Sequence, residues 1–140
     1  MCIRDSAWLE RARATATRVV MIDYGVAATP ELIGRSWLRT YKQHDRGFDP
    51  LRSPGERDIT TDVAFDQLGP DFLTTQADWL RAHGIDELVA QARATWHERA
   101  AIGDLPALKA RARVNEADAL LDPDGLGGFL VAEWGDGQIG

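Results

Sequence analysis

The sequence predicts an α/β fold with about three strands and several helices. Three short segments, at residues 18–24, 72–74 and 129–134, have the apolar composition of strands. The segments between them repeat apolar residues at helical spacing and are bounded by residues that cap or stop helices. Strands that are separated by helices are typical of the α/β class.

The N-terminal region is predicted to hold a helix followed by a strand. Residues 7–16 place apolar side chains at helical spacing. Residues 19–22 form an unbroken apolar run, which predicts a strand covered on both faces, as in a parallel sheet. Residues 30–35 are expected to make one helical turn.

A long polar loop is predicted next, with no regular element from residue 36 to residue 57. Loops of this length inside a compact domain are usually either functional or disordered, and the many polar groups in this one favour a functional loop. Residues 61–68 are then expected to form a short helix, which Gly69-Pro70 stops.

Three helices are predicted in the C-terminal half. Thr75 is a suitable N-cap for the first, and Gly84 is expected to end it. The second helix is expected to begin at Ile85. The third covers residues 104–121, where a proline falls in the first turn and is tolerated there.

These strands are too few for a complete sheet. The strand at residues 18–24 is apolar enough to need a neighbour on each side, because an exposed apolar edge promotes association. Residues 1–6 look like a translated sequencing-adapter scar, so we expect natural sequence to begin near Ala7. Residues 7–140 are expected to be the C-terminal portion of a single, larger α/β domain.

Composition limits the partners of this chain. Its net charge is −6 and its pI is about 5.0, which disfavours nucleic acid or an anionic membrane as the main partner. No apolar run approaches the roughly 20 residues of a membrane span. Cys2 is the only cysteine, so no disulfide framework is expected. The simplest location is the reducing cytoplasm of a bacterium.

A candidate ligand site follows the first strand. Asp23-Tyr24-Gly25 stands at the carboxyl end of that strand, where open α/β sheets bind ligands. The alternative is a turn that ends the strand, with Gly25 supplying a positive φ. The loop beyond adds further polar residues, with His44 as a possible general base or a hydrogen-bonded loop histidine.

The order of these segments resembles the C-terminal half of the MidA-type S-adenosylmethionine-dependent methyltransferases. The N-terminal matching pieces are residues 22–25, 38–41 with 44, 49–51, 54–55, 58–60, 63 and 65. The remaining pieces are residues 75–76, 80, 84–85, 120–121, 126–127 and 129. Departures occur at Thr61-Asp62 and at Leu130, and they bear on the substrate more than on the fold.

The resemblance implies a class I, Rossmann-like methyltransferase fold and S-adenosyl-L-methionine as cofactor. Asp23, Tyr24 and Gly25 would form one edge of the cofactor pocket. Class I enzymes bind the cofactor mainly through an N-terminal half whose Gly-rich turn is not found before Ala7. The run at residues 135–140 fits G-x-G-x-x-G, but no helix follows it, so we interpret it as a chance match. The chain alone is therefore expected to be inactive.

The resemblance also implies a protein substrate. The family includes a mitochondrial assembly factor that methylates an arginine of a complex I subunit, so a respiratory-complex subunit is a candidate partner. A cationic arginine would be held by carboxylates. Asp58, Asp49 and Asp45 are candidates, with turn capping as the alternative for Asp49 and Asp58.

The substrate-side residues implied in this way lie in the long loop, and Asp58 and His44 are the candidates for catalysis. The full substrate-side set is Arg39, Tyr41, His44, Asp58 and Thr60. No metal site is predicted, because the spacing of His44, Asp45 and Asp49 matches no common ligand pattern. The competing hypothesis is a free-standing interaction module of α/β type without catalysis.

Overall fold

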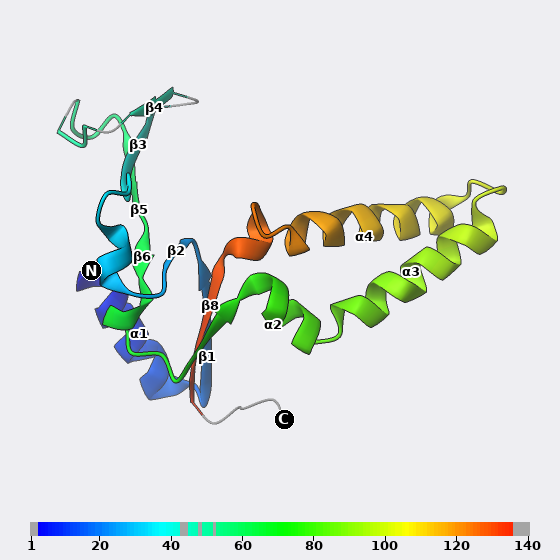
Figure 1. Cartoon of the computed structure of the whole chain (residues 1–140), viewed down its shortest axis with the longest axis horizontal. Helices are drawn as coiled ribbons and strands as arrows, with labels where there is room; N and C mark the ends of the chain where they lie inside the picture. The colour runs from blue at the N-terminus through cyan, green and yellow to red at the C-terminus, as the bar shows by residue number, and fades with distance from the viewer. Residues whose placement is uncertain (1–2, 43–44, 48, 52, 136–140) are drawn as a thin grey trace. The chain divides into compact units, whose positions relative to one another are not determined.

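The computed structural model describes residues 3–42, 45–47, 49–51 and 53–135, which form four α-helices, three 3-10 helices and eight strands (Figure 1). These residues divide into two compact units. The first covers the described residues up to Leu73 together with residues 132–135, and the second covers residues 74–131. The prediction of a mixed α/β protein is confirmed.

The predicted N-terminal helix and the three predicted strands are all present. Helix α1 covers Ile3–Thr15, and strands β1, β7 and β8 cover Arg18–Asp23, Phe72–Thr75 and Leu130–Gly135. The strands form one sheet in the order β1-β8-β7.

Strands β7 and β8 run antiparallel. The backbone N–H of Asp71 donates to the carbonyl of Glu133 at 2.9 Å, and the N–H of Gln76 donates to the carbonyl of Phe129 at 2.7 Å. Because the partner numbers fall as the strand numbers rise, the two chains pass in opposite directions. The last strand of the chain therefore lies between the first strand and β7.

The predicted loop between residues 36 and 57 is partly a sheet, so that prediction was wrong. Strand β3 (Leu38–Lys42) pairs antiparallel with both β4 (Asp45–Gly47) and β5 (Asp58–Thr61) (Figure 1). These strands carry mostly polar residues, so they lack the apolar alternation that reveals a strand in a sequence. Their pairing is long-range, which no local pattern reports.

The predicted helix at residues 61–68 was also wrong. Residues Val63–Ala64 form strand β6, which pairs in parallel with β2 (Gly25–Val26). Only Phe65–Gln67 is helical, as the 3-10 helix η2, and a second 3-10 helix, η1, covers Thr29–Leu32. Tertiary pairing with β2 overrides the local helical spacing here.

Strand β1 is not covered on both faces, contrary to the prediction. Val19 is buried, but Val20 and Ile22 are 37% and 46% exposed. The core of the first unit lies elsewhere, around Phe65 and Trp134, which are almost completely buried. The indole N–H of Trp134 donates to the carbonyl of Gly69 at 2.9 Å, so its polar atom is satisfied.

The second unit is built from α2 (Gln76–Ala82), α3 (Ile85–Arg99), α4 (Leu105–Leu121) and the 3-10 helix η3 (Leu126–Gly128). The predicted cap at Thr75 is confirmed, and Asp104, where the third helix was predicted to start, is also an N-cap. The Thr75 hydroxyl accepts a hydrogen bond from the Asp78 N–H at 3.1 Å, and the Asp104 carboxylate accepts one from the Ala107 N–H at 3.1 Å.

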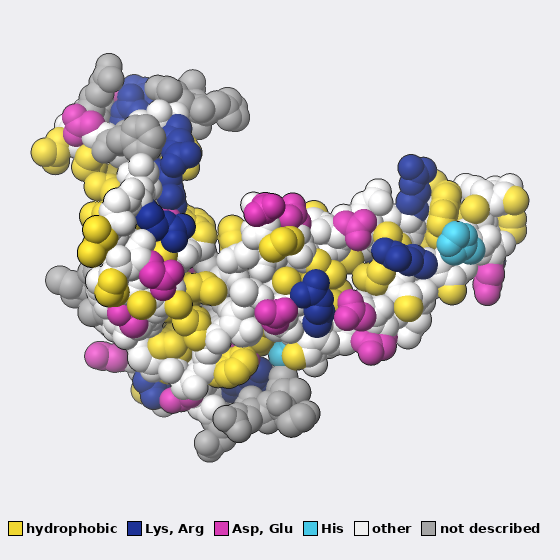
Figure 2. Space-filling view, in the orientation of Figure 1, with side chains coloured by type: hydrophobic (Ala, Val, Ile, Leu, Met, Phe, Trp, Pro, Cys, Tyr) yellow, Lys and Arg dark blue, Asp and Glu magenta, His cyan; other side chains and the backbone are white. Residues whose placement is uncertain are grey.

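Helices α3 and α4 lie side by side and pack mainly through small residues (Figure 1). Their buried side chains are alanines, at positions 92, 107, 110 and 117. Some larger apolar side chains of the pair are exposed, and Leu88 and Leu105 are each 62% exposed. Figure 2 shows hydrophobic side chains exposed along this part of the molecule.

Candidate functional site

The carboxyl end of β1 is held together by local contacts. The Asp23 carboxylate accepts a hydrogen bond from the Tyr24 N–H at 2.8 Å. Gly25 is not a positive-φ turn residue, contrary to the alternative raised from the sequence. It is required for another reason: a Cβ at this position would lie 2.1 Å from the carbonyl oxygen of Val63. Only glycine lets β2 approach β6 this closely.

Tyr24 reaches from the end of β1 onto the β3–β5 sheet. Its hydroxyl makes a hydrogen bond with the Thr60 hydroxyl. The Arg39 guanidinium lies over its ring, with the guanidinium carbon 5.1 Å from the ring centroid. Three residues predicted to be functional from the sequence therefore meet at one place.

Arg39 also makes an ion pair with Asp62. One guanidinium nitrogen donates to an Asp62 carboxylate oxygen, and another donates to the Ser36 carbonyl at 3.2 Å. The side chains of Arg39 and Asp62 are only 16% and 8% exposed. Burial acts to lower the pKa of Arg39, but the hydrogen bond and charge of Asp62 outweigh it, and the pKa is raised above its usual value. Arg39 is therefore a fixed cation.

Four of the predicted substrate-side residues share one face of the β3–β5 sheet. Arg39 pairs with Thr60, and Tyr41 pairs with Asp58. Because residues two apart on a strand point to the same side, these two cross-strand pairs lie on one face. Tyr41 is half-buried, whereas Asp58 is exposed.

The other predicted loop residues behave differently. The exposed Asp49 accepts a hydrogen bond from the Leu51 N–H at 2.9 Å, which matches the turn-capping alternative. Asp45 belongs to β4. His44 lies outside the described residues, as do positions 136–140 of the glycine-rich run. Within the described ranges, no group of three or more histidine, cysteine, aspartate or glutamate side chains is arranged to hold a metal ion.

Asp62 is the residue of this cluster that the sequence did not single out. It appeared only as a departure from the methyltransferase pattern. A carboxylate that contacts Arg39 cannot be found from spacing, because residues 39 and 62 are 23 positions apart. The register of β3 with β5 is what brings them together.

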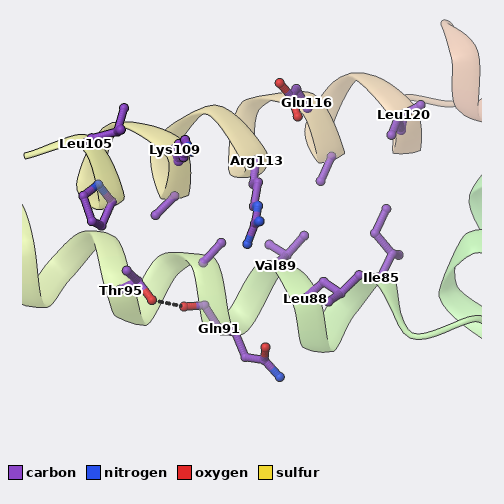
Figure 3. Close-up of a pocket in the computed structure, with 14 residues that line it drawn as sticks. Ile85, Leu88, Val89, Gln91, Thr95, Leu105, Lys109, Arg113, Glu116 and Leu120 are labelled. Atoms are coloured by element: carbon purple, nitrogen blue, oxygen red, sulfur yellow. Dashed lines mark hydrogen bonds between the residues drawn. The ribbon is translucent and has the colours of Figure 1, made fainter.

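A second concave surface lies between α3 and α4, within the second unit. It is a groove of about 730 Å³ whose lining includes Leu88 and Val89 on α3 and Leu105 on α4 (Figure 3). Lys109, Arg113 and Glu116 line it along α4. None of the site residues predicted from the sequence lines this groove.

Comparisons with known proteins agree with the resemblance. Residues 1–84 match the family described as "Putative S-adenosyl-L-methionine-dependent methyltransferase". A native crystal structure of an uncharacterized COG1565 superfamily protein from Burkholderia thailandensis matches with a TM-score of 0.69 at 25% identity. A superfamily member from the same organism, solved bound to S-adenosyl-homocysteine, matches with a TM-score of 0.61 at 26% identity. No curated protein matches the chain.

The two structural matches cover most of this chain but a minor part of the solved proteins. They cover 99% and 91% of this chain, and 39% and 34% of the two solved chains. This chain therefore spans less than two-fifths of the length of the solved structures that it matches. Among the described helices, none has both the length and the apolar composition needed to cross a membrane.

Proposed function

We propose that this chain, which belongs to the methyltransferase family matched by its residues 1–84, supplies the substrate-side half of an enzyme that methylates protein arginine. The enzyme would use S-adenosyl-L-methionine, and its class I sheet would include β1, β8 and β7. The observation that carries the proposal is the single face bearing Arg39, Tyr41, Asp58 and Thr60, which meets Tyr24 at the carboxyl end of β1.

The exposed carboxylate on this face suits a cationic acceptor. Asp58 is exposed and stands opposite Tyr41, so a guanidinium could donate hydrogen bonds to it while packing on the tyrosine ring. When bound, the cofactor supplies an activated methyl group for an in-line transfer. The chain's own residues then have to orient the acceptor nitrogen and exclude water. Asp58 and His44 are the two candidates for taking the proton that the methylated nitrogen loses.

The residues at the end of β1 fit one edge of a cofactor pocket. Asp23 and Tyr24 offer a carboxylate and a hydroxyl, although each already makes hydrogen bonds within the cluster. Gly25 is explained by the approach of β6, so it need not contact the cofactor. The remaining walls would come from other parts of a longer protein.

The surface of β1 supports the idea of a larger domain. Strand β1 is at the edge of its sheet, and the apolar side chains of Val20 and Ile22 are exposed. Native domains avoid exposed apolar edge strands, so further strands and helices would cover this one. The protein partner, for which a respiratory-complex subunit is our candidate, would then approach the β3–β5 face.

The first test measures cofactor binding by the chain itself. We expect calorimetry to detect weak S-adenosyl-L-methionine binding or none, because one edge of a pocket gives few contacts. A dissociation constant of about 1 μM, which corresponds to a binding free energy of about −8 kcal/mol, would show that the chain holds a complete cofactor site. That result would contradict the division into a cofactor half and a substrate half.

The second test supplies the remaining part of the enzyme. Residues 7–140 would replace the matching segment of the Burkholderia thailandensis protein that was solved with S-adenosyl-homocysteine. We expect the chimera to bind S-adenosyl-homocysteine and to transfer labelled methyl groups to proteins of a bacterial lysate. Acid hydrolysis should release labelled methylarginine. Label in another amino acid would contradict the proposed acceptor.

Single substitutions in the chimera then test the site residues. Asp58→Asn should reduce methyl transfer by about tenfold or more if the carboxylate orients the acceptor, and His44→Ala tests the second candidate. Glu56→Gln is the matched control, since Glu56 makes a solvent-exposed ion pair with Lys42 in the same unit. An equal loss in all three variants would remove Asp58 and His44 from the site.

A second candidate function is an interaction module without catalysis. The groove between α3 and α4 and the exposed leucines at positions 88 and 105 favour it, because exposed apolar surface commonly marks contact with another protein. A chimera that binds S-adenosyl-homocysteine normally but methylates no lysate protein would support this alternative.

A further inference from the structure

Asp62 is attached to the β3–β5 sheet by its backbone as well as by its side chain. Its N–H donates to the Trp37 carbonyl at 2.8 Å, which continues the β3–β5 pairing one step beyond Thr61. Its carboxylate is 8% exposed and meets the guanidinium of Arg39. Both the backbone of Asp62 and its carboxylate are therefore held in place.

The geometry of Arg39 uses the shape of the guanidinium group. The group binds Asp62 and the Ser36 carbonyl through two different nitrogens, while its central carbon lies over the ring of Tyr24, 5.1 Å from the ring centroid. A lysine ammonium has no planar face and cannot make these contacts together. Arg39 thus joins a carboxylate that follows β5 to an aromatic ring that follows β1.

These side-chain contacts add to a backbone link between the same two elements, in which the Val63 N–H donates to the Tyr24 carbonyl at 3.2 Å and β2 pairs with β6. Tyr24 follows the strand whose carboxyl end we assign to the cofactor side, whereas Arg39, Asp58 and Thr60 lie on the proposed acceptor face. The Tyr24–Thr60 hydrogen bond and the Tyr24–Arg39 cation–π contact are side-chain contacts that join them. The second contact depends on Asp62, because Asp62 fixes the plane of the guanidinium.

We propose that Asp62 is a positioning residue, which holds Arg39 over Tyr24 and thereby sets the acceptor face of the β3–β5 sheet against the end of β1. Asp62 does not touch the acceptor in this role. It acts through Arg39, and the proposal rests on the proposed function because the distance it sets is that between acceptor and cofactor. Methyl transfer is sensitive to such placement.

The first measurement uses the full chain and needs no cofactor or substrate. Amide hydrogen exchange would be compared for the unsubstituted chain, Asp62→Asn, Arg39→Lys and the double variant. We expect each single change to speed exchange at β3 and β5 by about tenfold or more, with little change in α2 to α4. The double variant should be no worse than either single one, since both remove the same contact.

Two further variants guard against simple unfolding. Asp62→Glu keeps the carboxylate, so it should restore much of the protection that Asp62→Asn loses. Glu56→Gln breaks the exposed ion pair with Lys42 and should leave exchange at β3 and β5 almost unchanged. Additive effects of Asp62→Asn and Arg39→Lys, or equal effects of Glu56→Gln, would overturn the proposal.

The second measurement separates positioning from structural support. In the chimera, Asp62→Asn should raise KM for the protein acceptor by about tenfold while the affinity for S-adenosyl-homocysteine stays the same. Asp62→Glu should recover most of the loss. If KM stays unchanged although exchange at β3 and β5 is faster, Asp62 has a structural role only and the proposal is wrong.

The two measurements also distinguish this proposal from the proposed function. An unsubstituted chimera that binds S-adenosyl-homocysteine but transfers no methyl group would contradict the enzyme. An active chimera in which Asp62→Asn leaves KM for the acceptor unchanged would contradict the positioning role and leave the enzyme standing. The exchange data would still show whether Asp62 joins β5 to β1 through Arg39.

Discussion

The two compact units are stabilised by different kinds of contact. The first unit buries large side chains such as Phe65 and Trp134 and keeps a partly buried ion pair between Arg39 and Asp62. The second packs α3 against α4 through alanines and leaves Leu88 and Leu105 exposed. The first unit therefore has a core of large buried side chains, whereas the α3–α4 pair exposes apolar side chains that could contact another protein.

The family match divides along similar lines. It covers residues 1–84, which include all of the β3–β5 sheet and α2 but none of α3 and α4. The candidate methyltransferase site and the matched region therefore coincide, while the groove between α3 and α4 lies outside that region. Function common to the family is to be sought in the first unit.

The largest expected effect compares a buried and an exposed apolar residue. Phe65 is completely buried in the first unit, so Phe65→Ala should cost about 3–5 kcal/mol of unfolding free energy. Leu88→Ala in the second unit should change it by no more than about 0.5 kcal/mol, because Leu88 is 62% exposed. Urea unfolding of the two variants measures both values. Similar losses would mean that the groove is part of a core.

The next effect tests the close approach of β2 and β6. Gly25→Ala places a methyl group against the Val63 carbonyl and should cost about 1–3 kcal/mol, because the two strands must separate. Gly34→Ala is the control. Gly34 has a φ of 79° and open space around it, so that variant carries only the smaller left-handed strain of about 1 kcal/mol. A milder effect at Gly25 than at Gly34 would contradict the packing argument.

A smaller effect tests the start of the second unit. Thr75→Ala removes the N-cap of α2 and should lower the unfolding free energy by about 1 kcal/mol. Thr95 provides the control, since its hydroxyl donates to the Gln91 carbonyl within α3 at 3.0 Å and caps nothing. Thr95→Ala should be neutral or slightly stabilising. Thermal unfolding by circular dichroism distinguishes the two.

The smallest effect concerns acid and is expected in both units. The hydrogen bond from the Thr29 N–H lowers the pKa of Asp66 below the ordinary 3.8. The hydrogen bond from Arg99 likewise lowers the pKa of Asp104 below 3.8. A depressed carboxyl pKa stabilises the fold above about pH 4, and this stability is lost as the pH falls through the folded-state value. Asp66→Asn and Asp104→Asn should each flatten the fall in melting temperature between about pH 4 and pH 2. Unchanged acid profiles would contradict the assignment.

Local signals in the sequence predicted the helices α1 to α4 and the strands β1, β7 and β8. Caps at Thr75 and Asp104 and the apolar run before Asp23 depend on neighbours in the chain, so spacing alone reveals them. The strands β3 and β5 were missed because they are polar and pair across many residues. The same pairing creates the contact between Arg39 and Asp62, so the cluster could be predicted only in part.

Exposure was harder to predict than secondary structure. Trp8 and Trp37 are 51% and 43% exposed, although tryptophans at such positions are more often part of a core. Val20 and Ile22 are exposed although their apolar side chains predicted burial. The apolar character of a side chain can be read from the sequence, but its burial depends on which other elements pack against it.

The two-residue pairing of β2 with β6 has a consequence for how this family can diversify. It brings Gly25 and Val63 together and so closes residues 27–62 into an excursion whose ends are fixed side by side. Closing a longer excursion costs little, about 0.6 kcal/mol for each doubling of length. Insertions, deletions or exchange of this segment between relatives can therefore alter the acceptor face without displacing β1. Under the proposed function, such changes would alter the contacts with the acceptor and leave the end of β1 in place.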